Sequence, residues 1–277
     1  MNSRILYTPK NETLRRKRRN RLWPVMAVLF VVISCLAALI YLLRLPYWQI
    51  KHIEVTGNET ISADDLRLAA EELLQGEKIF IIPRRAIFAI DGKALSAAIS
   101  SRFPKIAGLE VNKIFPDSLW LAVREREFFG VYCNDLDTAT STFRGEAACA
   151  YIDRSGFAYD KAPAVSGSLI LRVSSDRSDV LIPGQLLQPE TMDKMREIAD
   201  ALDKVVAIKI TGYILFSKIE SEIRILAQEG FELWFKSDDD FEKAALVLKK
   251  VLEGEIKERR PRLQYVDLRL GNKVFYK

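Results

Sequence analysis

The sequence predicts a membrane-anchored α+β protein, with one transmembrane helix near the N-terminus and two following domains that mix strands and helices. Residues 22–43 contain no charged side chain, and the 21 residues before them are strongly basic. Beyond this run, strand-like alternation and helix-like apolar spacing follow each other without a repeat. Some 230 residues of that composition are enough to bury one or two hydrophobic cores.

The apolar run from Leu22 to Leu43 predicts a membrane-spanning helix. Its 22 residues would extend about 33 Å as a helix, which matches the hydrocarbon core of a bilayer. Residues 1–21 carry eight Lys or Arg and one acid, so the positive-inside rule places this tail in the cytoplasm and the rest outside it. Trp23 lies at one edge of the run and the pair Tyr47-Trp48 at the other, where aromatic rings prefer the headgroup region.

Two other interpretations of this run stay open. A cleaved signal peptide has a shorter apolar region of about 7–15 residues and a small-residue cleavage site. The string Val32-Ile33-Ser34-Cys35 resembles a lipoprotein processing site, but residues 36–43 remain apolar after the cysteine. We therefore expect an uncleaved anchor, and we interpret the basic tract at residues 15–19 as a topology determinant that touches anionic lipid rather than as a nucleic-acid site.

The extracytoplasmic part is nearly neutral and holds two cysteines. Outside the tail the chain has 34 basic and 36 acidic residues, so a polyanionic partner is not indicated. Cys133 and Cys149 form an even pair in an oxidising compartment, at the two ends of a polar interval between strand-like segments. We predict a disulfide between them, while two buried thiols would give the same sequence.

The first extracytoplasmic stretch predicts a compact α+β unit. Apolar residues alternate over residues 49–56, and Gly57-Asn58 supplies turn chemistry after them. Ser62 and Asp91 are suited to cap helices, and each precedes an apolar stripe at helical spacing. The predicted order is a strand at 49–56, a helix after Ser62, a helix after Asp91, and a hairpin of strands at 108–115 and 118–127.

The second half predicts a sheet with two helices. Pro189 and the run Asp238-Asp239-Asp240 each stand where a helix begins. The expected strands lie at 128–132, 150–152, 206–218, 221–228 and 231–236, with a last strand from about Leu263.

Several strings of this chain resemble the FtsQ/DivIB family of bacterial cell-division proteins. They are Ile53-Glu54-Val55-Thr56-Gly57-Asn58, Phe103-Pro104-Lys105-Ile106, Phe115-Pro116-Asp117-Ser118-Leu119, Val123-Arg124-Glu125-Arg126, Tyr151-Ile152-Asp153-Arg154-Ser155-Gly156 and Tyr265-Val266-Asp267-Leu268-Arg269. Each string is common by itself, but their order and spacing after a basic tail and one span are typical of the family. The segment between the two cysteines is longer than the resemblance leads us to expect.

The resemblance implies a POTRA domain followed by a β domain of the FtsQ type. We expect a cytoplasmic tail at 1–21, a transmembrane helix at 22–43, a POTRA domain at 47–127 and a β domain at 128–277. It further implies a single-pass type II protein of the plasma (inner) membrane at the division septum. The implied function is a non-enzymatic scaffold that binds single-span division proteins of the FtsB/DivIC and FtsL types.

The residues offer no catalytic, metal or cofactor site that we can predict. The chain has a single histidine, His52, so histidine-based triads and the usual zinc sites lack their parts. The three aspartates at 238–240 are interpreted as a helix cap rather than as a pair of catalytic acids. Two alternative functions stay open: a POTRA-containing component of protein translocation or envelope assembly, and an anchored cell-wall hydrolase, which this search disfavours.

We predict that the partner-binding segment is the C-terminal strand, which comprises Tyr265, Val266, Asp267, Leu268, Arg269 and Leu270. Little sequence follows that could cover it, so its outer backbone edge is expected to accept a partner strand. Val266, Leu268 and Leu270 are expected to face the core, with Tyr265 and Arg269 on the opposite face for recognition. The alternative is that residues 274–276 fold back and block this edge.

Overall fold

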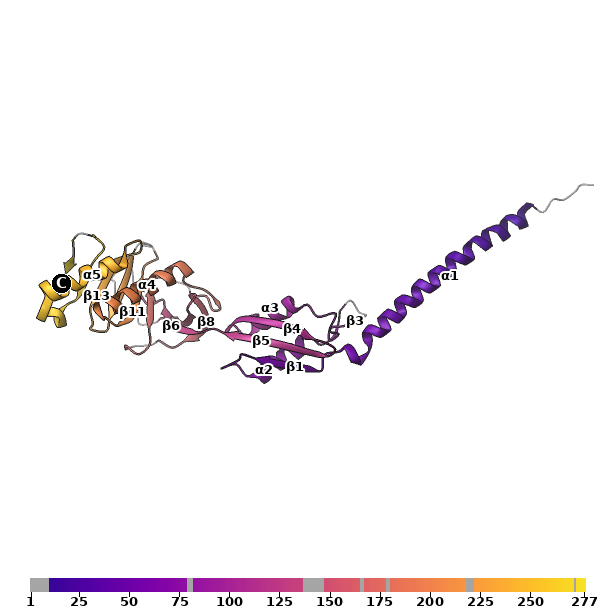
Figure 1. Cartoon of the computed structure of the whole chain (residues 1–277), viewed down its shortest axis with the longest axis horizontal. Helices are drawn as coiled ribbons and strands as arrows, with labels where there is room; N and C mark the ends of the chain where they lie inside the picture. The colour runs from indigo at the N-terminus through magenta and orange to yellow at the C-terminus, as the bar shows by residue number, and fades with distance from the viewer. Residues whose placement is uncertain are drawn as a thin grey trace, which may run out of the picture. The chain divides into compact units, whose positions relative to one another are not determined.

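The computed structural model describes residues 10–78, 82–136, 147–164, 167–177, 180–217, 222–271 and 273–277. The first nine residues of the predicted tail and most of the polar interval between Cys133 and Cys149 lie outside these ranges. The chain divides into two compact units. The first comprises Met1–Arg102 and Gly108–Glu125, and the second comprises Phe103–Ala107 and Arg126–Lys277. Figure 1 labels the elements of both.

The first unit begins with a long helix, α1 (Lys10–Arg44). Its stretch Trp23–Leu42 is long and apolar enough to cross a membrane, with a mean hydropathy of 2.9 and no residue buried against the rest of the protein. The helix therefore starts before the predicted span, because the backbone of the basic tail from Lys10 onward is helical as well. A short 3₁₀ helix, η1 (Pro46–Trp48), follows it.

A three-stranded sheet and two helices complete the first unit, in the predicted order. Strand β5 (Ser118–Glu125) lies between β1 (His52–Thr56), to which it is parallel, and β4 (Ile106–Ile114). The helices are α2 (Ala63–Leu73) and α3 (Gly92–Arg102), and a small hairpin pairs β2 (Glu77–Lys78) with β3 (Ile82–Pro83).

Local capping chemistry sets where these helices begin. The hydroxyl oxygen of Ser62 accepts a hydrogen bond from the Asp64 N–H (3.3 Å), and Asp91 Oδ1 accepts from the amides of Lys93 and Ala94 (3.0 and 3.3 Å). These bonds satisfy amides that have no partner inside the helix. Both caps were predicted from the sequence, and they are confirmed.

The second unit is built on one large sheet. In the described residues its strand order is β10-β8-β7-β6-β9-β11-β12-β13-β14-β15. The strands are β6 (Phe128–Cys133), β7 (Cys149–Asp153), β8 (Phe157–Ala162), β9 (Arg172–Ser175), β10 (Gly184–Gln185), β11 (Ile210–Leu215), β12 (Glu222–Ala227), β13 (Glu232–Lys236), β14 (Tyr265–Asp267) and β15 (Phe275–Tyr276).

Helices α4 (Pro189–Val206) and α5 (Phe241–Val251) provide the other layer of the core. Alternate residues of β12 and β13, such as Ile225 and Leu233, are fully buried in the same cluster as the apolar residues of these helices. Asp240 caps α5 by accepting a hydrogen bond from the Lys243 N–H (3.1 Å), so the helix-cap interpretation of the three aspartates is confirmed. The fold class, an apolar N-terminal helix followed by a POTRA-like unit and a mixed sheet with helices, is confirmed as well.

The predicted strand boundary at Val206 is wrong. A strand was expected to begin at Val206, but this residue is the last one of α4, and β11 starts at Ile210. Ala207 caps the C-terminus of this helix with a left-handed backbone, φ of 53°. That conformation is usually supplied by glycine, so the sequence gives no stop signal at this position.

Candidate functional site

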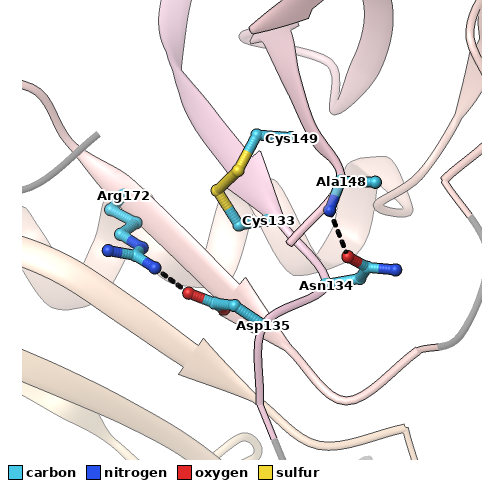
Figure 2. The surroundings of a disulfide bond; sticks show 6 residues. All are labelled: Cys133, Asn134, Asp135, Ala148, Cys149 and Arg172. Carbon is cyan, nitrogen blue, oxygen red and sulfur yellow. Dashed lines mark hydrogen bonds and ion pairs between the residues drawn. A yellow bond between two sulfur atoms is a disulfide. The ribbon is translucent and has the colours of Figure 1, made fainter. Parts of the chain in front are cut away.

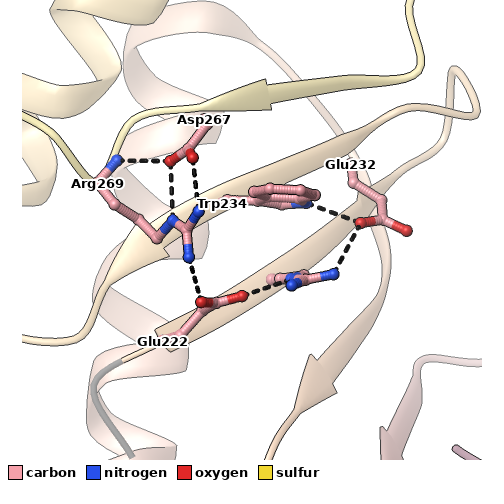
Figure 3. A network of polar contacts seen from close by, with 6 residues as sticks. Glu222, Glu232, Trp234, Asp267 and Arg269 are labelled. Atoms are coloured by element: carbon pink, nitrogen blue, oxygen red, sulfur yellow. Dashed lines mark hydrogen bonds and ion pairs between the residues drawn. The ribbon is translucent and has the colours of Figure 1, made fainter. Parts of the chain in front are cut away.

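The predicted partner-binding segment passes through a network of aromatic and charged side chains on the face of the sheet opposite the helices (Figure 3). Cross-strand register aligns Arg224 of β12 with Trp234 of β13, and Trp234 with Asp267 of β14. We call Arg224, Trp234, Tyr265 and Arg269 the aromatic–arginine site. Side chains that lie opposite each other on one face of a sheet are close enough to interact, so this register assembles the site.

Trp234 is the centre of the site. The ring of Tyr265 stacks on it with centroids 4.5 Å apart and an interplanar angle of 8°. The guanidinium carbon atoms of Arg224 and Arg269 lie 4.1 and 4.9 Å from the Trp234 ring centroid. Glu232 Oε2 accepts a hydrogen bond from the indole N–H of Trp234 (2.7 Å), which fixes the orientation of the ring. Stacked aromatic rings with arginine are typical of energetically important interface residues.

Two buried carboxylates hold the arginines in place. Arg269 donates two side-chain hydrogen bonds to Asp267, from Nε (2.9 Å) and Nη2 (2.6 Å), and its backbone N–H donates a third (3.0 Å). The second carboxylate, Glu222, accepts from Arg269 Nη1 and from Arg224 Nε (2.5 Å). Asp267 and Glu222 are only 7% and 5% exposed, so both depend on these guanidinium groups for compensation of their charge.

The pKa values of this cluster follow from the same contacts. The hydrogen bonds from Arg269 hold the pKa of the Asp267 carboxyl below its ordinary value, and burial opposes them only in part. In return, the hydrogen bonds to Asp267 raise the pKa of Arg269, and the charge of Glu222 adds to this effect. Asp267 and Arg269 are therefore both charged at neutral pH.

The structure corrects two expectations about the C-terminal strand. Leu270 was expected to face the core, but it is 55% exposed because β14 ends at Asp267 and the chain then turns. The outer edge of β14 was expected to be open, but β15 pairs with it antiparallel, in register Val266 with Tyr276. Val266 and Leu268 are buried as predicted (0% and 4% exposed).

At the β14 end of the described sheet, the terminal strand is therefore β15, while β10 ends the sheet on the other side. Tyr265 and Lys277 exchange both of their backbone hydrogen bonds (3.4 and 3.3 Å). Because hydrogen-bonded and non-bonded pairs alternate along an antiparallel ladder, the neighbouring residue Tyr276 directs its N–H and C=O away from β14. The side chains of Phe275 and Tyr276 are 51% and 38% exposed. Blocking of β14 thus moves the open backbone edge outward by one strand.

Sequence reasoning missed Glu222, Arg224 and Trp234. A signal for the first two exists, because Glu222 and Arg224 alternate with Ile223 and Ile225 along one strand. Such alternation places both polar residues on the face opposite the core. The contact between Glu222 and Arg269 could not be predicted from the sequence, since these two residues are 47 positions apart.

The two cysteines lie opposite each other on β6 and β7 and are joined by a disulfide (Figure 2). Their Cα atoms are 4.2 Å apart, and both residues are buried. Next to them, the Asn134 side-chain oxygen accepts a hydrogen bond from the Ala148 N–H (2.8 Å), and Asp135 forms an ion pair with Arg172. The disulfide therefore links the end of β6 to the start of β7.

Three of the strings singled out in the sequence meet around Arg126 and Asp153. Arg126 Nη1 forms an ion pair with Asp153 Oδ2 (2.6 Å), and its Nε donates to the Pro104 carbonyl (2.9 Å). The other carboxylate oxygen of Asp153 accepts from the backbone amides of Ser155 (2.8 Å) and Phe157 (3.0 Å). Burial alone would raise the pKa of Asp153, but these bonds, with that from the Ser155 hydroxyl, lower it. These strings therefore have a structural role, namely to brace the hairpin of β7 and β8.

A second carboxylate braces the first unit. Glu125 Oε1 accepts hydrogen bonds from the consecutive backbone amides of Glu59, Thr60 and Ile61 (2.7, 2.9 and 2.9 Å), and Oε2 accepts from the Thr60 hydroxyl. Burial would raise the pKa of this carboxyl, but the Thr60 hydroxyl and then the amides lower it to about 2. Glu125 thereby fixes the turn between β1 and α2.

Among the described residues, no group of three or more His, Cys, Asp or Glu side chains is arranged to hold a metal ion. The geometry offers a half-buried aromatic–arginine site beside an open strand edge. Such an arrangement is suited to binding another polypeptide.

Comparison with known families shows which type of domain the first unit contains. The family described as "POTRA domain, FtsQ-type" matches residues 48–126, which include all three strands of the small sheet and both of its helices. No curated protein matches the chain significantly. A domain of this type supports a role in cell division, and together with the apolar helix it fits a single-pass membrane division protein. The chain thus carries a POTRA domain of the FtsQ type at residues 48–126, which supports its resemblance to the FtsQ/DivIB family.

Proposed function

We propose that this chain is a non-enzymatic scaffold of the bacterial division machinery at the septum. Residues 1–21 would lie in the cytoplasm, residues 22–43 would cross the membrane, and the domains at 47–127 and 128–277 would lie outside it. The eight-to-one excess of basic over acidic residues in the tail supports this orientation. A reporter that is active only outside the cytoplasm should be active when fused after Lys277 and silent when fused after Arg21. The opposite pattern would refute the orientation.

The partners are single-span helical proteins of the FtsB/DivIC and FtsL types, bound at the C-terminal strands. The observation that carries this proposal is the open edge of β15 beside the aromatic–arginine site. A partner segment would add a strand to β15 through the backbone groups of Tyr276 and place side chains against Phe275 and Trp234. Tyr265 to Leu270 would support this interface from the neighbouring strand.

A matched pair of variants tests the strand addition. Tyr276→Pro removes the outward-facing N–H, whereas Tyr276→Ala removes only the side chain and keeps that donor. Proline is tolerated at an edge position whose N–H faces solvent, so both variants should fold. The full chain is co-expressed with the helical partners, crosslinked mildly in membranes and purified. Tyr276→Pro should lose the partners and Tyr276→Ala should retain most of them, while equal recovery with both variants would exclude strand addition at β15.

A further inference from the structure

Four aromatic rings form a continuous row on the first unit. Tyr47 and Trp48 contact each other edge to face with centroids 4.9 Å apart, Trp48 contacts Phe88 at 5.2 Å, and Phe88 contacts Phe115 at 5.5 Å. We call these four residues the aromatic row. Tyr47, Phe88 and Phe115 are 59%, 52% and 58% exposed. Large apolar side chains that are exposed together usually mark a contact with another molecule or with a membrane.

The backbone fixes this row to the segment that follows α1. The Ile87 N–H donates to the Trp48 carbonyl (2.9 Å), which holds the Phe88 loop beside η1. The Lys51 N–H donates to the Asp117 carbonyl (2.8 Å), which holds the loop after Phe115 beside the start of β1. Residues far apart in the sequence are therefore gathered around the first few residues beyond the helix.

The row lies close to the membrane because of the length of the connecting chain. The apolar span ends at Leu42, and Tyr47 follows five residues later. Even a fully extended chain of that length reaches only about 18 Å, and helix α1 uses part of it by continuing to Arg44. The headgroup layer on each side of the hydrocarbon is roughly 5–8 Å thick. The row therefore cannot lie far from the membrane surface.

The chemistry around the row also fits lipid. Tyr and Trp prefer the boundary between headgroups and hydrocarbon. Arg84 and Arg85 are exposed, and the Arg85 carbonyl accepts a hydrogen bond from the Ile50 N–H (2.9 Å), so this basic pair runs beside the same segment. Cationic side chains next to a membrane are attracted to anionic headgroups.

We propose that the aromatic row and the basic pair form a membrane-contact surface, which seats the POTRA domain on the anionic phospholipid interface of the outer leaflet. This inference rests on α1 crossing the membrane, as the proposed function also requires. It adds that Phe88 and Phe115, far from the span in sequence, are immersed in the headgroup layer. The domain would then be oriented by lipid as well as by its tether.

Fluorescence quenching in vesicles tests this surface with the full chain. In a Cys35→Ser background, a cysteine is introduced as Phe88→Cys or Phe115→Cys and labelled with a fluorophore. The control is Glu59→Cys, an exposed position past the other end of β1 in the same unit. Cys133 and Cys149 are joined and buried, and they do not react with the label. The vesicles contain phosphatidylglycerol, phosphatidylethanolamine and a phospholipid with a nitroxide on its headgroup.

We expect the labels at 88 and 115 to lose most of their emission to the nitroxide and the label at 59 to keep it. Adding Arg84→Glu and Arg85→Glu should restore part of the emission in these vesicles but cause no change in vesicles of phosphatidylcholine. Equal quenching at all three positions, or none at 88 and 115, would overturn the membrane contact. In the second case the row is free for a protein partner.

Carbonate washing separates this failure from a failure of the proposed topology. A chain that spans the bilayer stays with the vesicles after the wash, whatever the labels report. Release by carbonate would show that α1 does not anchor the chain, which removes the basis of both proposals. Retention with unquenched labels would overturn the contact surface alone.

Discussion

Replacing Arg269 by alanine should destabilise the second unit, because this residue compensates the charge of two buried carboxylates. The change removes both side-chain hydrogen bonds to Asp267 and the ion pair with Glu222. Glu222 keeps Arg224 as a partner, so Asp267 is the group left without its guanidinium. The sequence predicts Arg269 as an outward recognition residue, and the structure gives it a second role as the partner of these two carboxylates.

The magnitude follows from burial. Removing one partner of a buried ion pair lowers the free energy of unfolding by about 3–5 kcal/mol. The Arg269 side chain is 31% exposed, and the backbone N–H of residue 269 still donates to Asp267, so both features lower the cost. We expect a loss of about 2–3 kcal/mol in the free energy of unfolding at neutral pH.

The pH dependence gives a second and independent readout. Asp267 has a lowered pKa in the folded protein, so its stabilising contribution is present above the unfolded carboxyl pKa of about 3.9 and is lost as the pH falls through the folded value. In Arg269→Ala that contribution is absent at every pH, and burial favours the neutral form of Asp267. The difference in stability between the two proteins should therefore shrink as the pH falls below about 4.

Urea unfolding followed by Trp234 fluorescence measures this difference in the second unit. The other three tryptophans belong to the first unit and are replaced by phenylalanine. The control is Arg196→Ala, which breaks an exposed pair with Asp193 (2.8 Å) and should cost no more than about 0.5 kcal/mol. If Arg269→Ala costs no more than this control at pH 7, or if its cost persists unchanged at pH 3, the charge-compensation argument is wrong.

Three further predictions concern bonds that brace the two units. Replacing Cys133 and Cys149 by alanine should cost about 3 kcal/mol by the chain-entropy estimate, measured by urea unfolding, and alkylation of the unreduced, unfolded wild type should modify neither residue. Glu125→Gln should destabilise the first unit at neutral pH but not at pH 2, since the lowered carboxyl pKa makes its contribution present above about pH 4.5 and lost toward pH 2; thermal unfolding by circular dichroism at both pH values checks this. Gly57→Ala should lower the melting temperature, because Gly57 has φ of 77° and an added Cβ would lie 2.2 Å from a backbone carbonyl oxygen, whereas alanine at Thr60 should cost less.

Sequence reasoning succeeded where the determinants of structure are local. The caps at Ser62, Asp91 and Asp240 were predicted because a side chain and an amide two or three residues later form the bond. The order of strands and helices in the first unit was predicted because apolar spacing and turn residues mark each element. The pairing of Cys133 with Cys149 was predicted from their positions at the ends of two strand-like segments.

Reasoning from the sequence failed where a distant residue decides the outcome. Leu270 continues the alternation of Val266 and Leu268, so nothing local indicates that the strand ends before it. The ion pair of Arg269 depends on Glu222. The outer edge of β14 is covered because Phe275 and Tyr276 pair with it. A sheet is assembled from segments that are remote in sequence, so its edges and cross-strand clusters are the features that periodicity predicts least well.

The dual role of Arg269 determines how the partner-binding proposal should be tested. Alanine at this position weakens the fold and removes a recognition group together, so a loss of binding has two possible causes. Tyr265→Ala has the same weakness, because it removes the stack on Trp234. At Tyr276 the outward N–H takes no part in the pairing with β14, and the Pro and Ala variants differ in that donor. The interface is identified by a variant that no longer binds the partners but unfolds at the same urea concentration as the wild type. Tyr276→Pro can meet both conditions, whereas Arg269→Ala can meet only the first.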